Sequence, residues 1–225
     1  MKVNYQVGSD LRFGKGEPYR YFCRFSGTVQ HRKETIARVD GLVFLFESML
    51  NERQSWFETC DVEQQSMDIC EAMCRRNNYQ DFVEAAGGPG YDLLHVEGMQ
   101  ILPAYRGQGL GHAILLNTIQ TFGRGCAVVV IEPHPIRYTD QDDVRARPKT
   151  DFDTAMMWNE LANTEQRYKA GARKLAAHWA KLGFERVPKS KRFWYLELNN
   201  FVVPSEFQDG VYVDGDDEDE DDDDE

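Results

Sequence analysis

One stretch of the chain, residues 96–122, constrains the fold more than any other. It begins with an apolar run that contains a single carboxylate and ends at Pro103. A glycine-rich turn follows over residues 106–111, and the next residues place apolar side chains at the i, i+3, i+4 spacing of a helix. The segment therefore predicts a strand, a tight turn and a helix in direct succession.

The turn has the composition of an anion-binding loop. Glycines let backbone N–H groups approach a ligand closely, and the start of a helix carries the positive end of the helix dipole. Arg106 adds a guanidinium fork suited to a diphosphate. Two familiar phosphate loops do not fit, because His112 stands where a P-loop has lysine and where a dinucleotide fingerprint has its third glycine.

The pattern that remains, Arg-x-x-Gly-x-Gly, resembles the acyl-CoA loop of the GCN5-related N-acetyltransferase (GNAT) superfamily. The lead-in at residues 103–105 and the Lys-Leu-Gly-Phe at residues 181–184 resemble the same family. The resemblance covers residues 93–198 well and the first ninety residues poorly. It implies an α/β fold in which a mixed central sheet splays between two central parallel strands and is flanked by helices.

The charge of the chain is concentrated at its end. Residues 214–225 hold eleven acidic side chains, and without them the 38 acidic residues fall to 27, against 26 basic ones. Such a segment cannot bury apolar surface, so we expect a disordered acidic tail after a single domain of residues 1–213. The tail improves solubility, binds a basic partner or occupies the protein's own basic groove; the sequence leaves these three roles open.

The compartment is predicted from three features that are missing from the sequence: a signal peptide, a membrane-spanning apolar run and a regular cysteine spacing. The first ten residues have no apolar core of a signal peptide, and the longest purely apolar run is residues 42–46. The five cysteines are scattered without a zinc spacing, and Cys70 and Cys74 suit a buried helix face. We therefore expect a cytoplasmic, reduced protein with no metal and no membrane contact.

The order of the elements departs from the resembled family. Residues 3–47 are β-prone, and Asp40 with Gly41 indicates a hairpin, with a single bulged strand as the alternative. A helical insert is expected at about residues 48–90, just before the central strand, and a second insert at about 133–170. The apolar run 127–131 predicts a strand covered on both faces, and residues 184–187 and 192–198 predict the last two strands.

The resemblance implies acetyl-CoA as cofactor. Its diphosphate would lie against Arg106 and the backbone of the loop, and Met99 and Ile101 would pair through their main chains with the pantetheine arm. The N–H of Met99 is the expected oxyanion donor. The loop residues expected to bind the cofactor are Arg106, Gly107, Gln108, Gly109, Leu110 and Gly111.

Glu97 is the predicted general base, directly or through a water, because it is the only carboxylate of the strand at residues 93–102. A structural carboxylate is the alternative. Strand alternation predicts Glu97 on the same face as Met99 and Ile101. The family often has a tyrosine where this chain has Trp179, so Tyr195, Tyr168 or solvent would supply the leaving-group proton.

These observations predict an acyl-CoA-dependent N-acyltransferase that moves an acetyl group to an amine of a small molecule or protein in a ternary complex. The alternative is a non-catalytic protein of the same fold that acts through its acidic tail on a basic partner or as a nucleic-acid mimic. The sequence does not identify the acceptor or the oligomeric state, with a homodimer as one option, and nucleic acid is not an expected ligand.

Overall fold

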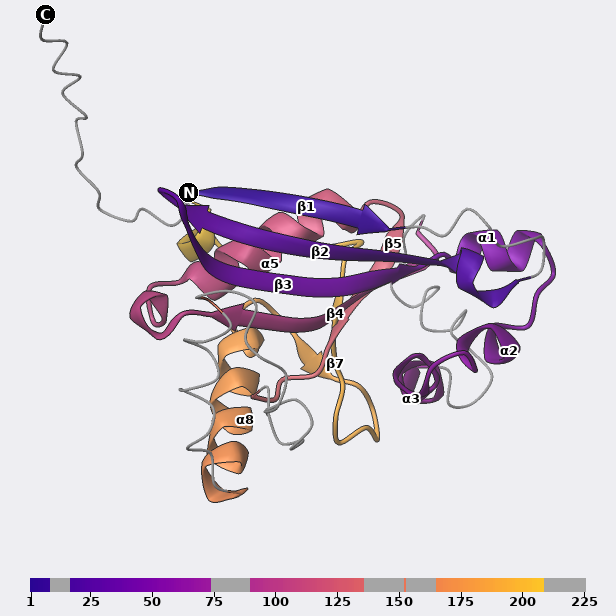
Figure 1. Cartoon of the computed structure of the whole chain (residues 1–225). Helices are drawn as coiled ribbons and strands as arrows, with labels where there is room; N and C mark the ends of the chain where they lie inside the picture. The colour runs from indigo at the N-terminus through magenta and orange to yellow at the C-terminus, as the bar shows by residue number, and fades with distance from the viewer. Residues whose placement is uncertain (9–16, 74–89, 136–151, 153–164, 209–225) are drawn as a thin grey trace, which may run out of the picture.

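A seven-stranded, mostly antiparallel sheet organises the protein. The computed structural model describes residues 1–8, 17–73, 90–135, 152 and 165–208 (Figure 1). The strands lie in the order β1-β2-β3-β4-β5-β7-β6, and β4 and β5 are the parallel pair. Their bounds are β1 Lys2–Gly8, β2 Phe22–His31, β3 Glu34–Phe44, β4 Asp92–Ile101, β5 Cys126–Ile131, β6 Glu185–Arg186 and β7 Trp194–Glu197.

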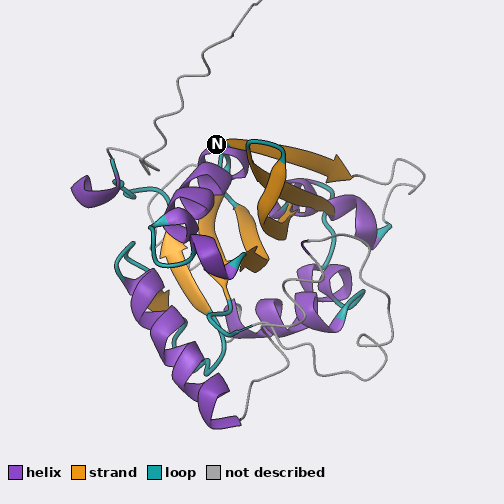
Figure 2. Ribbon diagram, turned by 60° about the vertical axis from the view of Figure 1, so that its left-hand side comes forward, coloured by secondary structure: helices purple, strands orange, loops and turns teal. Residues whose placement is uncertain are grey.

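Helices flank both faces of the sheet, and each face has its own apolar core (Figures 1 and 2). One face packs against α5 and α8, which contribute side chains such as Leu115 and Trp179. The opposite face packs against α1 to α3 through side chains such as Met49 and Ile69. The helices are α1 Phe46–Asn51, α2 Trp56–Cys60, α3 Gln64–Met73, α5 Leu110–Phe122 and α8 Glu165–Ala180, with short 3-10 turns η1 Pro18–Tyr21, η2 Pro103–Tyr105 and η3 Ser205–Phe207. The expected mixed α/β architecture is confirmed at this level.

The hairpin predicted at Asp40 and Gly41 is wrong, and the alternative of one bulged strand holds. Both residues lie inside β3, where the pairing registers with β4 shift between them. The chain instead turns between β2 and β3, where Arg32 adopts a positive φ of 55°. Gly41 is required by packing, because a Cβ there would lie 2.3 Å from His95 O.

The same irregularity changes which side chains of β4 share a face. Asp40 pairs with Gly98 and Gly41 with Val96, so Glu97 is an extra residue in β4, a β-bulge. Val96 therefore packs in the same core as Met99 and Ile101. Glu97 lies on the opposite face, and the predicted alternation that placed it with Met99 and Ile101 is wrong.

The two parallel strands separate before they end. Pairing of β4 with β5 runs from Asp92 and Cys126 to Val96 and Ile131, although β4 goes on for five more residues to Ile101. Among the described strands, the second half of β4 thus pairs only with β3, on one edge. Its other, unpaired edge lies directly before the glycine-rich turn.

The predicted segments outside the sheet are described in part. The expected insert at residues 48–90 contains α2 and α3 and most of α1, while residues 74–89 lie outside the described part, as do most of the insert at 133–170 and the acidic tail at 214–225. The helix before the Lys-Leu-Gly-Phe segment is α8, and Gly183 has the positive φ of 91° that suits a helix end. The boundary of a single domain at residue 213 stays a prediction.

Two cysteines are joined in a way that the sequence analysis did not expect. Cys60 at the end of α2 and Cys70 in α3 form a disulfide, in contrast to the expected reduced set. Cys70 is buried, as its helix face predicted. Of the described helices, none combines the length and apolar character needed to cross a membrane.

Candidate functional site

The glycine-rich turn presents a row of backbone amides at the start of α5. Gly107 and Gly109 both have φ of 79°, a left-handed conformation that favours glycine. Within the described part of the chain, the amides of residues 107–111 donate to no backbone carbonyl, and the next amide that does so is His112 N, to Gly109 O at 3.0 Å. These amides lie at the positive end of a 13-residue helix and can bind an anion.

Arg106 is exposed and connects this turn to the end of β4. Its Nε donates to Ile101 O at 2.8 Å. Gln108 closes the turn from the other side, because its Nε2 donates to Ala104 O at 3.0 Å. The guanidinium therefore lies beside both the amide row and the unpaired edge of β4.

The backbone N–H and C=O groups of Met99 and Ile101 point towards the edge of β4 at which the pairing with β5 has ended. Leu102 N donates to Ile36 O of β3 at 2.9 Å. Backbone groups of successive strand residues point to alternate edges, so Gln100 also faces β3, whereas Met99 and Ile101 face away from it. The two residues expected to pair with a pantetheine arm thus have their N–H and C=O groups at this edge, where Ile101 O already accepts the hydrogen bond from Arg106 Nε.

A small cavity lies where β4 and β5 separate. It holds about 60 Å³, enough for a few waters or a short chemical group. Leu115, Trp179 and Met99 reach it from the face covered by α5 and α8, while Glu97 reaches it from the opposite face. Glu132 and His134, which follow β5, also line it. The cavity is therefore accessible to groups from both faces of the sheet.

Glu97 enters this cavity as half of an ion pair. Arg24 Nη1 donates to Glu97 Oε1 at 3.2 Å, and Arg24 also pairs with Glu63 beside α3. Burial raises the pKa of Glu97, while the positive charge and hydrogen bond of Arg24 oppose the rise. The ion pair agrees with the alternative that Glu97 is a structural carboxylate, and its role as the general base stays a prediction.

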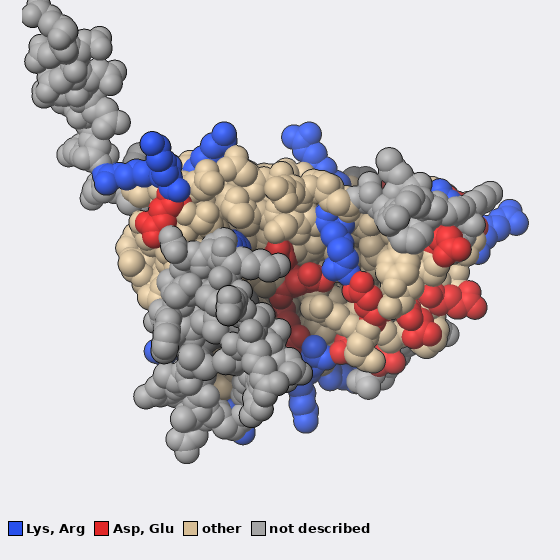
Figure 3. All heavy atoms as spheres, viewed as in Figure 1, with Lys and Arg blue, Asp and Glu red and all other residues tan. Residues whose placement is uncertain are grey.

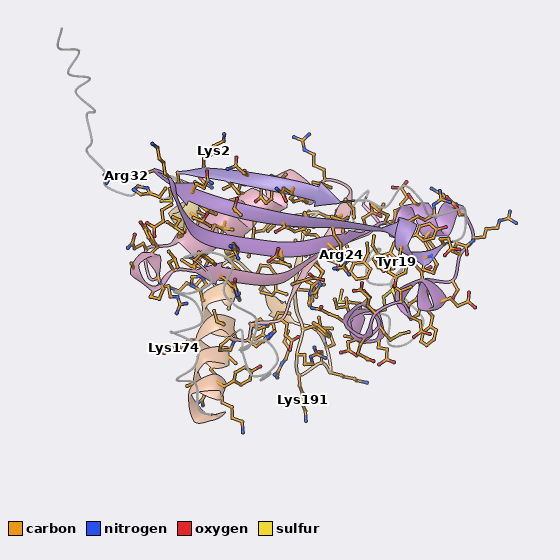
Figure 4. The ribbon with its side chains drawn as sticks, viewed as in Figure 1. Lys2, Tyr19, Arg24, Arg32, Lys174 and Lys191 are labelled. Atoms are coloured by element: carbon orange, nitrogen blue, oxygen red, sulfur yellow. A yellow bond between two sulfur atoms is a disulfide. The ribbon has the colours of Figure 1, made fainter. Side chains whose placement is uncertain are left out.

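A second arginine repeats this arrangement on the other side of the cavity. Arg192 donates through Nε and Nη2 to the two carboxylate oxygens of Glu132, at 3.0 and 2.8 Å, and pairs with Asp68 of α3. Figure 3 shows acidic side chains gathered in the middle of this face with basic ones beside them, and Figure 4 shows Arg24 on the side of the strands nearest α1 to α3. We call the group of Asp40, Glu63, Asp68, Glu97 and Glu132 the carboxylate cluster.

Three aromatic residues bear on which group protonates the leaving thiolate, and they lie in different surroundings. Trp179 lines the cavity beside Glu97 and Met99. Tyr195 lines a different cavity, with Lys181 and Glu185, and burial raises the pKa of its phenol. Tyr168 lies with its ring centroid 6.4 Å from that of His134, which itself lines the first cavity. The structure thus brings Glu97 and Met99 together and leaves Tyr195 apart from them.

A histidine pair next to the loop was missed in the sequence. His112 of α5 and His178 of α8 stack with ring centroids 3.6 Å apart, and His112 Nε2 lies 3.0 Å from His178 O. Gly111 makes room for this contact, because a Cβ there would lie 3.3 Å from His178 Nε2. The pair fixes α8 against the start of α5.

The other missed residues belong to the carboxylate cluster. Arg24, Glu63, Asp68 and Arg192 come from segments up to 168 positions apart in the sequence, counted from Arg24 to Arg192. The alternation of Arg20 and Arg24 with aromatic residues in the sequence marks a half-buried strand only. No local pattern shows that these charges meet.

Comparison of the chain with protein-family models, with curated proteins and with solved structures finds no match. Among the described residues, no group of three or more His, Cys, Asp or Glu side chains is arranged to hold a metal ion. The geometry of the loop, the unpaired edge and the cavity is thus what bears on function.

Proposed function

We propose that this chain is an acyl-CoA-dependent N-acyltransferase with a GNAT-like fold. One observation carries the proposal: the amide row of residues 107–111 follows closely on the edge of β4 that β5 does not pair with, where Met99 has its backbone N–H and C=O and Ile101 its N–H. An anion site followed by a free strand edge fits a long cofactor with a diphosphate at one end and amide groups along its arm.

The residues present fit such a cofactor. The amides of Gly107 to Gly111 and the guanidinium of Arg106 would hold the diphosphate, and the edge of β4 would pair with the amides of the arm. Bound acetyl-CoA supplies an acyl thioester as the group to be transferred. The cavity of about 60 Å³ has room for that reacting end and not for the whole arm.

Glu97, which lines the cavity, would take the proton of the acceptor amine at one of its carboxylate oxygens, directly or through a water. The amine nitrogen would then form the new C–N bond to the acyl carbon as the C–S bond breaks and the sulfur leaves as a thiolate. Met99 would donate its backbone N–H to the carbonyl oxygen as negative charge develops there. A thiolate needs no strong acid to leave, which accords with the position of Tyr195 away from Glu97.

Calorimetric titration with acetyl-CoA tests the proposal. We expect micromolar binding by the wild type and about tenfold weaker binding by Arg106→Gln, because a charge-assisted contact with phosphate is lost. The matched control is Arg124→Gln, which removes an exposed arginine beyond the opposite end of α5. Absence of binding by a folded wild type, or equal weakening by the two variants, would refute the proposed site.

A further inference from the structure

We propose that the acceptor of this chain is a primary amine that carries at least one further positive charge. The inference rests on the acyltransferase function proposed above and names the substrate class of that same site. It depends on three features of the face opposite α5: the charge balance of the carboxylate cluster, its connection to the cavity, and a buried histidine beneath it.

The carboxylate cluster has an excess of negative charge. Its five carboxylates face two arginines, Arg24 and Arg192, and each arginine serves two carboxylates at once. Asp40 pairs with neither arginine, and its partner among the described residues is a hydroxyl, Ser26 Oγ, at 2.6 Å. Three negative charges among the described residues of this cluster are therefore unbalanced, and a cationic ligand would be attracted to them.

The cluster opens into the cavity where transfer would occur. Glu97 and Glu132 each belong to both, with side chains only 22% and 15% exposed. A carboxylate at this depth interacts more strongly with a ligand cation than one in open solvent. The negative charge of the exposed Asp40 is close enough to raise the pKa of Glu97, so acidic groups extend from Asp40 to the point where β4 and β5 separate.

His95 provides an independent sign of a missing partner beneath the cluster. Its ring is fully buried between Leu42 of β3 and Val130 of β5, on the same face as Arg24, and neither ring nitrogen has a hydrogen-bond partner among the described residues. Burial, together with the charges of Arg24 and Arg192, lowers its pKa to about 3, so the ring is neutral and has one nitrogen that can accept a hydrogen bond. Buried polar groups without any partner are rare, and a water that accompanies a bound ammonium would satisfy this one.

The second charge follows from the chemistry of the transfer. The reacting amine must be neutral when it attacks, so it cannot balance the cluster at that moment. A further cationic centre on the same acceptor would keep the cluster occupied while the reacting nitrogen loses its proton to Glu97. Two sources share this chemistry, a free aliphatic polyamine and a lysine with a basic neighbour in a peptide.

Steady-state assays with acetyl-CoA and matched acceptors test the inference. Spermidine is compared with n-butylamine, and a blocked lysine–arginine peptide with a blocked lysine–alanine peptide. We expect kcat/KM to be about tenfold higher for the multiply charged member of at least one pair at low salt, and the advantage to shrink as ionic strength rises. The pair with the larger advantage identifies the source.

Two variants on the same strand separate a role of the cluster from general charge effects. Asp40→Asn should raise the KM of the favoured acceptor several-fold with kcat unchanged, whereas Glu34→Gln, an equal charge change six residues away, should leave both constants unchanged. Equal kcat/KM within both acceptor pairs, or equal effects of the two variants, would overturn the inference alone. Failure of the protein to bind acetyl-CoA in the titration described above would instead remove the acyltransferase function.

Discussion

Arg24 of β2 and Glu97 of β4 lie 3.2 Å apart between Nη1 and Oε1, so their ion pair crosses over β3, the strand between them. Glu97 lies on the face that carries Arg24 because it alternates with Val96, which packs in the core against α5. The β-bulge at Glu97 then returns Met99 and Ile101 to the core face. The pair thus fixes both the position and the ionisation of the candidate base.

Removing Arg24 should make Glu97 a carboxyl group that ionises less readily. Burial already raises the pKa of Glu97, and Arg24 opposes that rise, so Arg24→Gln should raise the pKa further. The acid limb of the pH profile of kcat/KM should move to higher pH in this variant, since the base must be deprotonated. A carboxylate ¹³C NMR titration of Glu97 should shift in the same direction without any acceptor present.

Arg20 is the matched control for this experiment. It also forms an ion pair with a glutamate, Glu52, at 2.9 Å, but Glu52 lies outside the cavity lining. Arg20→Gln should therefore leave the acid limb and the Glu97 titration where they are in the wild type. An unmoved profile in Arg24→Gln, or the same displacement in both variants, would contradict the electrostatic control of Glu97 by Arg24.

Replacing the carboxylate itself separates catalysis from structure. Glu97→Gln should lower kcat by about 10²- to 10⁴-fold with little change in acetyl-CoA affinity, because general-base catalysis typically contributes that much. Glu63→Gln is the comparison, since Glu63 pairs with the same arginine and does not line the cavity. Similar losses in the two variants would mean that Glu97 serves only to hold Arg24.

The parts of the site that were predictable are those encoded by neighbouring residues. Residues 106–111 form a tight turn because Gly107 and Gly109 adopt a backbone conformation that other residues avoid, and that preference is visible in a single short segment. The strand before the turn and α5 after it follow from hydrophobic spacing in the same way.

The bulge and the carboxylate cluster could not be predicted by such local arguments. A bulge at Glu97 depends on how β4 pairs with β3, and the Asp40–Gly41 pair that suggested a turn is part of the same irregularity. Arg192 meets Glu132 and Asp68 only because β7 lies beside β5 and α3 packs on that face. Tertiary pairing, which no single segment specifies, decides these contacts.

The disulfide between Cys60 and Cys70 should stabilise the α2–α3 region. Closing a loop of this size removes conformational entropy from the unfolded chain, worth about 2–3 kcal/mol in the chain-entropy model. The double variant Cys60→Ser/Cys70→Ser should lower the free energy of unfolding by that amount under oxidising conditions. Urea denaturation, with non-reducing mass spectrometry to establish the bond, measures the effect.

Reductant provides the control for this prediction. Dithiothreitol should destabilise the wild type by a similar amount and leave the double variant unaffected. If dithiothreitol leaves the free energy of unfolding of the wild type unchanged, although the disulfide was intact beforehand, the crosslink does not stabilise the fold.

Stability should fall as the pH drops below about 6.5, in part because of His178. Partial burial, together with the nearby His112 and Lys181, lowers the pKa of His178 to about 4 in the folded state. Between the ordinary pKa of about 6.5 and the folded pKa of about 4, the histidine binds a proton in the unfolded chain but not in the folded protein. The free energy of unfolding therefore decreases as the pH falls from 6.5 towards 4. His178→Gln should reduce the slope of the free energy of unfolding against pH by the equivalent of at most about one bound proton. Urea denaturation at several pH values across this range measures the slope.

Lysine variants on either side of the histidine test the cause of this pH dependence. Lys181→Met removes a positive charge that disfavours protonation, so it should raise the folded pKa of His178 and narrow the window in which stability is lost. Lys174→Met, an equal change earlier in α8 (Figure 4), should leave the window as it is. His95, whose pKa is lowered to about 3, adds a loss of the same sign in every variant, so the difference between variants isolates His178. If stability is lost over the same pH range in the wild type, Lys181→Met and Lys174→Met, then Lys181 does not act on the stacked histidines. If His178→Gln leaves the pH dependence of the free energy of unfolding unchanged, then the histidine pair does not sense pH.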